Sequence, residues 1–213
     1  MRTLAGAVAA LFLSVSGASA QQSFDWTRFY AGPFAGFGFG QSTFAAPAAA
    51  TPQTTFGTAG FSGGLVVGNT YNFNSFVLGG ELDVQAGGMT GSATCLGTTD
   101  SCQTSITWLS TLRGKAGIAT PVGLVYGTLG PALGGIEARV TPSGGTARIV
   151  DQTRIGYAAG CGFEMPISAK VTLGGEYLYS ELWKLEDSGT LTAGQTSASA
   201  QMHAIRAGAR FSF

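Results

Sequence analysis

Apolar residues alternate with small or polar residues along most of this chain, and the spacing of an amphipathic helix is almost absent. Eight segments carry the alternation, and turn-forming residues separate them. Alternating segments divided by turns are typical of transmembrane β-barrels. The pattern therefore predicts an all-β fold, an eight-stranded antiparallel transmembrane β-barrel, with strands at Phe29–Gly40, Thr58–Tyr71, Phe76–Gly87, Ser105–Ile118, Leu124–Ala138, Ile149–Glu164, Ala169–Leu182 and Ser199–Phe213.

The connections between these segments alternate in length. Long stretches follow the first, third and seventh segments, and a moderate one follows the fifth. The other three connections are short: Asn72–Ser75, Ala119–Gly123 and Met165–Ser168. Outer-membrane barrels have short periplasmic turns, long extracellular loops and an even number of strands. The lengths therefore place both termini in the periplasm.

The charged residues indicate which face of each strand points inward. In the last segment Ile205, Phe211 and Phe213 share one face, while Arg206 and Arg210 share the other. A lipid-facing arginine at mid-bilayer costs about 2–4 kcal/mol. We therefore expect the charged face to line the lumen.

The fourth segment divides in the same way. Its inward face carries Arg113 and Lys115. Its predicted lipid face carries Ile106, Trp108, Leu112 and Ile118. Leu109 here and Leu178 in the seventh segment are apolar residues that fall on the inward side.

The interior of an eight-stranded barrel is just wide enough for side chains to fill. The expected inward charges have both signs and should form a lumen network of Glu81, Asp83, Arg113, Lys115, Arg154, Glu176, Arg206 and Arg210. Two pairs lie at similar depth on adjacent strands and are predicted to be close, Glu81 with Arg113 and Glu176 with Arg206. A plugged lumen follows, rather than a wide pore.

Composition supports a lipid-embedded wall. The chain has 11 basic and 11 acidic residues, and this balance argues against a nucleic-acid partner, which needs a basic face. Hydrophobic residues make up 45%, which argues against disorder. No charged residue lies between Arg28 and Glu81, a stretch that a soluble domain would rarely leave uncharged.

The N-terminus is typical of an export signal. Arg2 is followed by the apolar stretch Leu4–Val15 and by small residues at Ala18–Ala20, where cleavage is expected. The alternative is a buried N-terminal helix. The predicted organisation is thus a cleaved signal peptide at residues 1–20 and an outer-membrane barrel domain at 21–213.

Several motifs, in this order, resemble a family of small proteobacterial outer-membrane β-barrel proteins, often labelled the porin family: Trp26–Gly32, Ala35–Gly40, Gly63–Gly68, Phe76–Asp83, Trp108–Gly117, Val125–Thr128, Glu176–Tyr179 and His203–Phe213. That family includes major surface antigens and haemin-binding proteins. The resemblance implies a location in the bacterial cell outer membrane. It also implies that Phe211 and Phe213 form the signal read by the outer-membrane assembly machinery.

Two prolines depart from the family's pattern. Pro33 and Pro131 stand where its members usually have glycine. Proline removes a donor from the strand ladder, and a closed barrel has no free edge to accommodate the loss. The strand around Pro131 is therefore the one whose pairing is least defined, and it leaves room for a bulge.

Two cysteines lie in an expected extracellular loop. An exported protein permits a disulfide, so Cys95 and Cys102 are predicted to be bridged, the alternative being two free thiols. Their spacing matches no usual zinc site, and neither a metal nor a cofactor is expected. Cys161 falls on the lipid face as a small apolar residue.

His203, the only histidine, lies near the outer end of the last segment. It is interpreted as a rim residue, with a haemin-ligand role as the alternative because the resembled family includes haemin binders. No serine lies in phase nearby for a catalytic triad. Glu81 and Asp83 could suggest acid–base chemistry, but facing Arg113 they are interpreted as structural. No catalytic residue is expected.

Aromatic residues cluster near the predicted strand ends, where interfacial girdles form, the alternative being core packing: Trp26, Phe29, Tyr30, Tyr71, Trp108, Tyr179 and Trp183. The expected function is non-enzymatic: a structural surface protein that supports envelope integrity and contacts a host or the environment. Its partners would be outer-membrane lipid and the assembly machinery. The alternatives are a narrow channel, a haemin receptor, or a secreted soluble β-sandwich.

Overall fold

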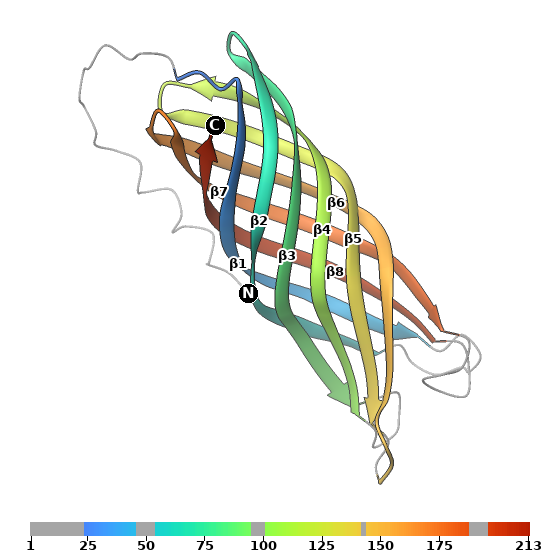
Figure 1. The fold of residues 1–213 in the computed structure, drawn as a ribbon. Coiled ribbons are helices and arrows are strands. Elements are labelled where there is room, and N and C mark those ends of the chain that lie inside the picture. Colours follow the sequence, from blue (N-terminus) through green and yellow to red (C-terminus); the bar gives the residue numbers. More distant parts are fainter. Residues whose placement is uncertain (1–23, 46–53, 95–100, 142–143, 188–195) are drawn as a thin grey trace, which may run out of the picture.

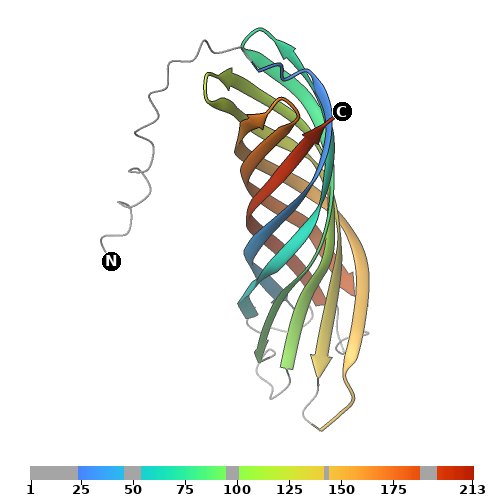
Figure 2. The same cartoon turned by 60° about the vertical axis from the view of Figure 1, so that its left-hand side comes forward.

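The computed structural model describes residues 24–45, 54–94, 101–141, 144–187 and 196–213. Its strands form a closed antiparallel barrel in which each strand pairs with its neighbours in the chain and β8 pairs with β1 (Figures 1 and 2). They are β1 (Arg28–Ala45), β2 (Thr54–Phe73), β3 (Phe76–Thr94), β4 (Ser101–Thr120), β5 (Gly123–Thr141), β6 (Arg148–Ser168), β7 (Val171–Asp187) and β8 (Thr196–Ser212). The eight-stranded barrel is confirmed. The expected signal peptide lies outside the described residues and stays a prediction.

Every strand is longer than a membrane crossing requires. The strands have 17 to 21 residues, most of them clearly more than the alternation alone predicts, whereas about 9–11 tilted residues cross a bilayer. The two-residue turns at 74–75, 121–122 and 169–170 lie at the end that also holds the C terminus (Figure 1). The extra strand length therefore lies toward the opposite end, which carries the longer loops.

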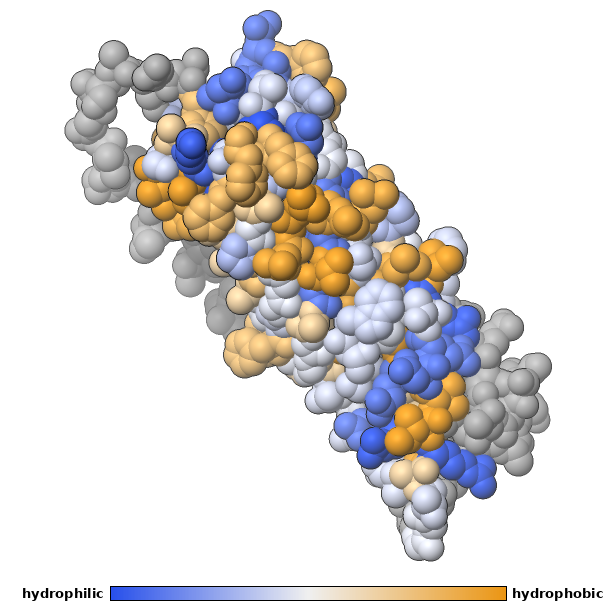
Figure 3. Space-filling view, viewed as in Figure 1, coloured by the Kyte–Doolittle hydropathy of each residue, from blue (hydrophilic) through white to orange (hydrophobic). Residues whose placement is uncertain are grey.

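The outer wall of the barrel is apolar over the part nearer the turns. Leu65, Leu129 and Phe76 are among its most exposed side chains there, at 67%, 65% and 62%. Figure 3 shows apolar residues gathered over the part of the wall nearer the C terminus, with polar residues denser toward the loop end. None of the described segments is a helix long and apolar enough to cross a membrane.

The interior is layered along the barrel axis, as the inward residues of β5 show. Leu124 belongs to an apolar cluster at the turn end, which we call the turn-side layer: Trp26, Val77, Leu124 and Tyr126, with Phe24 and Ala119 against it. Thr128 comes next, among charged groups. Ala132 belongs to a second cluster, which we call the loop-side layer: Met89, Ile106, Leu109, Ala132, Ile136, Ala158, Leu178, Leu182, Met202 and Ala204. Val140 lies in a third apolar cluster near the loops.

A bulge in β4 overturns one predicted orientation. Against β5 the register shifts between Ile106 and Trp108, so Thr107 has no partner there. Arg113 and Leu109 keep the expected inward direction, but Ile106 on the far side of the bulge is 5% exposed and packs inside. The prediction that Ile106 faces lipid is wrong, because one extra residue inverts the alternation beyond it.

Pro131 does not interrupt its strand. It is paired with Tyr157 of β6 in an unbroken register, and its side chain points outward. On its β4 side the ladder lacks the pairs Leu112–Pro131 and Arg113–Gly130, with no change of register, whereas the register shift between β4 and β5 falls at Gly135, opposite Trp108. The bulge for which Pro131 left room is therefore found elsewhere on the strand pair.

Two inward glycines of β1 make room for lumen side chains. A Cβ at Gly36 would lie 2.6 Å from the backbone oxygen of Ile205 and 3.0 Å from Cγ of Arg206, and one at Gly38 would lie 2.5 Å from the sulfur of Met89. These distances are shorter than a normal contact. These positions therefore stay small so that long side chains from β8 and β3 can cross the lumen.

Candidate functional site

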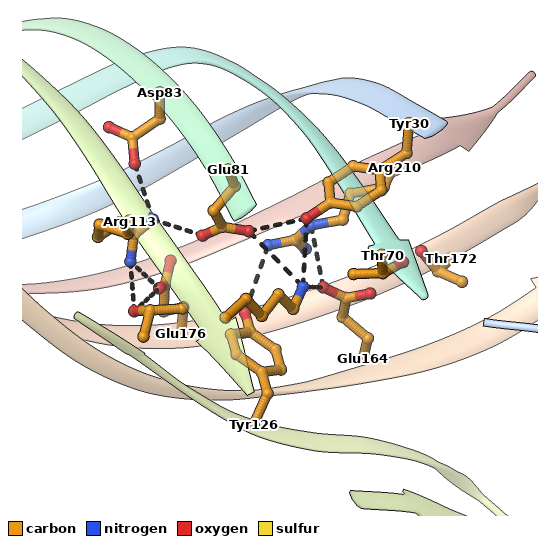
Figure 4. Close-up of polar contacts among 12 residues, drawn as sticks. Tyr30, Thr70, Glu81, Asp83, Arg113, Tyr126, Glu164, Thr172, Glu176 and Arg210 are labelled. Carbon is orange, nitrogen blue, oxygen red and sulfur yellow. Dashed lines mark hydrogen bonds and ion pairs between the residues drawn. The ribbon is translucent and has the colours of Figure 1, made fainter. Parts of the chain in front are cut away.

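The lumen charges centre on Arg113 of β4. Its Nη2 lies 2.6 Å from Oε1 of Glu81 and 2.7 Å from Oδ2 of Asp83, both on the adjacent strand β3. Its Nη1 contacts the carboxylate of Glu176 from β7, across the barrel, and donates to Oγ1 of Thr128 at 2.7 Å. One guanidinium therefore joins three carboxylates from two strands (Figure 4).

Glu164 of β6 is the second centre. Its carboxylate contacts Lys115 and lies 3.1 Å from Nε of Arg210 and 3.3 Å from Nη2 of Arg28. Lys115 also lies 3.6 Å from Oε2 of Glu81, which links the two centres. Three cations from β1, β4 and β8 thus converge on one carboxylate.

Hydroxyl groups and aromatic rings complete the network. Tyr30 of β1 donates to Oε2 of Glu81 at 2.9 Å, and Arg210 donates to the hydroxyl of Tyr126 at 3.3 Å. The ammonium of Lys115 lies 4.0 Å from the ring centroid of Tyr126, a distance at which cation–π attraction is appreciable. Both tyrosines therefore contact the charged groups in two ways, with their hydroxyl groups and with their ring faces.

The network is buried and nearly neutral. Its members are 8% exposed or less: Arg28, Glu81, Asp83, Arg113, Lys115, Glu164, Glu176, Arg206 and Arg210. Five of these side chains are basic and four are acidic. Burying charges is tolerated only where they are paired and hydrogen-bonded, and most of these polar atoms have a partner.

Apolar side chains close the network on both sides. The loop-side layer packs across the lumen above it, and the turn-side layer packs below, where Arg28 lies 4.8 Å from the ring centroids of both Phe24 and Trp26. The cavity among Phe34, Arg113 and Arg206 has a volume of about 10 Å³, which is room for about one water molecule.

The register brings together the two pairs that were expected to be close. Glu81 is paired with Arg113, and Arg206 Nη2 lies 2.5 Å from Oε2 of Glu176. Arg154 is not part of the network: it is half-buried and hydrogen-bonds Gln152. Arg154 lies ten residues before Glu164 on β6, about 33 Å along the strand. Its predicted side of the strand was therefore correct, but its predicted position along the barrel axis was wrong.

Sequence reasoning missed Arg28 and Glu164 as members of the network. Glu164 has the same phase as Arg154, and Arg28 has the same phase as the inward residues of β1. An even spacing from residues already assigned to the lumen was therefore the sequence feature that could have identified them. Arg28 was overlooked because the predicted strand begins one residue later, at Phe29.

Two residues predicted for the membrane interface lie inside the barrel instead. Trp26 is 2% exposed and Tyr30 is 1% exposed. Tyr30 has the inward phase of Arg28, and Trp26 precedes β1 and packs into the turn-side layer. Phe29, Tyr71 and Trp183 are exposed, and Trp108 and Tyr179 are partly exposed, on the wall.

The remaining predicted site residues lie away from the lumen network. Cys102 is buried and disulfide-bonded, and its predicted partner Cys95 lies outside the described residues. Cys161 is a free, exposed thiol on the wall. Phe211 and Phe213 are exposed at the end of β8 and beyond it.

His203 lies in an aromatic cluster on the outer wall. Its Nδ1 is 2.6 Å from the hydroxyl of Tyr177, and its ring stacks on Phe39 with centroids 5.4 Å apart. Tyr179 packs against the same ring and donates to Oε2 of Glu181 at 2.8 Å. The cluster draws on β1, β7 and β8.

The barrel and its filled lumen can be compared with known proteins. The profile of a family described as "Outer membrane protein beta-barrel domain" matches residues 7–211. This chain belongs to the outer-membrane β-barrel family. Its relatives include the 31 kDa outer-membrane immunogenic proteins of Brucella melitensis and Brucella suis, each 31% identical over 185 residues, covering 80% of this chain and 77% of the relative. The chain is therefore an outer-membrane protein.

Solved structures of this architecture agree in fold. The outer membrane protein OprG of Pseudomonas aeruginosa matches with a TM-score of 0.55 at 14% identity, covering 90% of this chain and 99% of that one. The outer membrane protease OmpT of Escherichia coli matches with a TM-score of 0.55 at 9% identity, covering 87% and 97%. At such identities the likeness concerns the barrel alone.

Proposed function

We propose that this outer-membrane barrel is a closed, non-enzymatic surface protein that contributes to envelope integrity and contacts a host or the environment. The observation that carries the proposal is the lumen: a paired ionic network lies between two apolar layers. Such an interior stabilises a wall and leaves no path for a solute. The immunogenic Brucella relatives support exposure at the cell surface.

The same interior argues against conduction and against catalysis. An ion crossing the lumen would meet the loop-side layer, where Leu109, Leu178 and Leu182 are at most 2% exposed. Glu81 and Asp83 are each held by Arg113 at 2.6–2.7 Å, so neither carboxylate is available as a general base.

Planar-bilayer recordings test the closed lumen. We expect no stepwise currents from refolded protein whose folding is verified by its heat-modifiable gel mobility. Currents that change in size or selectivity in Lys115→Gln would show an aqueous path through the network and would support the narrow channel instead. Antibody labelling of intact cells tests surface exposure in parallel.

Haemin binding is a second candidate function, favoured by the cluster at His203. Tyr177 holds Nδ1, and among the described residues no hydrogen bond reaches Nε2, which leaves that nitrogen free to bind iron. Phe39, Tyr177 and Tyr179 offer ring faces to a flat porphyrin. Haemin titration of the wild type and His203→Ala decides the matter, since unchanged binding removes His203 as the ligand.

A further inference from the structure

Among the residues that the structure describes, the outer part of β6 is paired on one side only. Pairing with β5 runs from Leu124↔Glu164 to Val140↔Arg148, along almost the whole strand. Pairing with β7 stops at Gly156↔Leu182. Among the described residues, the segment Arg148–Ile155 of β6, which we call the open edge, has no ladder partner on its β7 side.

The gap arises because β7 turns away from β6. A continued register would place Trp183–Asp187 opposite Asp151–Ile155. That part of β7 pairs with β8 instead, at Leu185↔Ala198 and Asp187↔Thr196, after a register shift beyond Leu182. Within the part of the chain that the structure describes, the backbone groups on one side of the open edge thus have no ladder partner of the kind found elsewhere in the ring.

The open edge lies outside the membrane. Ten residues separate Val171 from Glu181 on β7, which at about 3.3 Å per residue and a tilt of roughly 40° rises about 25 Å, the height of the apolar band of a barrel. Glu181 is paired with Tyr157, and the open edge begins beyond that level. Figures 1 and 2 show the β5–β6 hairpin reaching farthest at the loop end.

The open edge has the composition of a strand and few of the usual protections. It contains Ile149, Val150, Thr153 and Ile155, all β-branched, and it has no proline, glycine or lysine. Its pairing with β5 has no bulge. Exposed edges accept a further strand unless proline, a bulge or charged side chains, above all lysine, prevent it. Its three charged residues have mixed signs and do not repel a partner as a set.

We propose that the open edge of β6 binds an extended segment of a partner polypeptide outside the cell, which adds a strand to the sheet. Backbone hydrogen bonds to the edge would provide affinity. Ile149 and Ile155, each about half exposed, favour apolar side chains at alternate positions of the partner strand. Asp151, which lies between them, favours a basic or hydrogen-bonding side chain opposite it. This inference rests on the surface exposure proposed above.

The partner is a different chain rather than a second copy. Two barrels in one membrane are related by rotation about the membrane normal. Because the strands are tilted from the membrane normal, this rotation places the two copies of β6 at an angle to each other. They cannot then pair as antiparallel strands. A homodimer through this edge therefore requires inverted barrels, and size-exclusion chromatography with light scattering of nanodisc samples would reveal it.

Amide exchange of the protein alone is the first test. In nanodiscs we expect fast exchange at alternate amides of residues 148–155, because their N–H groups point to the open side, and slow exchange throughout 134–140 of β5. Protection of every amide in 148–155 would show that another part of the chain covers the edge, and this result would overturn the proposal.

Peptide titration followed by NMR is the second test. The probe copies Gly134–Thr141, whose inward and outward residues already match this part of β6. The control peptide carries proline for Ile136 and Ala138. We expect the probe alone to shift the amides of 148–155. We also expect Thr153→Lys in the protein to weaken binding about tenfold or more, with Thr141→Lys as the matched control.

Shifts elsewhere on the barrel, or equal shifts with both peptides, would overturn strand addition at this edge. The outcome is separable from the proposed function. The bilayer recordings and the surface labelling can support the proposed function even if the peptide does not bind the open edge. Conversely, currents through the barrel would contradict the closed lumen and would not change the result of the peptide titration.

Discussion

Arg113 shows how much one lumen side chain determines. It contacts Glu81, Asp83 and Glu176, and its side chain is fully buried. Removing one partner of a buried ionic group costs far more than the group contributes when intact, because the remaining charges lose their partner in a place that water does not reach.

We therefore expect Arg113→Met to lower the free energy of unfolding by about 3–5 kcal/mol. Urea unfolding in lipid vesicles, followed by gel mobility, measures the change. Arg139→Met is the matched control: Arg139 pairs at 3.5 Å with Glu137 and is 43% exposed, so its loss should cost about 0–1 kcal/mol. Equal losses in the two variants would contradict a special role for the network.

The side of the wall to which a residue points could be predicted from the sequence wherever the alternation of side chains along a strand decides it. The inward placement of Glu81, Glu176 and Arg206 follows from alternation and the cost of charge in lipid. Depth along the strand does not follow from phase, and for that reason Arg154 was wrongly included. Trp26 could not be placed because it precedes the first strand, and its position depends on packing at the turn end.

At the scale of the element, the bulge of β4 sets which residues of its outer half point inward. Ile106 and Leu109, three residues apart, both lie in the loop-side layer. A strand without a bulge would place them on opposite faces. The signal for this extra residue is absent from the chain because Thr107 and its neighbours have ordinary strand composition.

Thiol labelling tests the bulge directly. Ile106→Cys should react slowly with a membrane-soluble maleimide and Leu112→Cys, 58% exposed at the native residue, should react rapidly. Mass spectrometry identifies the labelled site in the presence of the native cysteines. Rapid labelling at both positions would show that residue 106 faces lipid and would contradict the bulge in β4.

The end of β8 offers a second prediction at this scale. We expect Phe213→Ala to reduce the amount of protein assembled in the outer membrane, as a recognition signal requires. Refolding into detergent should be unchanged, because the ring is 84% exposed and contacts Phe29 alone among the described aromatics. A refolding defect of equal size would instead indicate a structural role for Phe213.

At the scale of the whole molecule, the sequence predicts the architecture well. Strand number, antiparallel order and the filled lumen follow from alternation, loop lengths and charge placement, which are all local or additive signals. Strand length was underestimated, because the alternation outside the membrane weakens into polar residues on both faces. The departure of β7 from β6 could not be foreseen, since it depends on pairing across a long loop.

The loop end supplies the last prediction. We expect a disulfide between Cys95 and Cys102, which would stabilise the connection between β3 and β4 by about 2–3 kcal/mol. Peptide mapping without reduction measures it. Recovery of both peptides as free thiols from protein exported in the cell would refute the bridge.

Each of the six strands that contribute to the lumen network carries charge of one sign there, and this affects the order of assembly. The acids come from β3, β6 and β7, and the bases come from β1, β4 and β8. The hairpin β3–β4 holds two acids and two bases, and the strands β6–β8 together also hold two of each, so both sets can be neutralised early. Arg28 on β1 reaches Glu164, its carboxylate partner, only when the first and last strands meet. Ring closure therefore supplies the last ion pair of the network, and a half-closed sheet would leave Arg28 without its carboxylate partner.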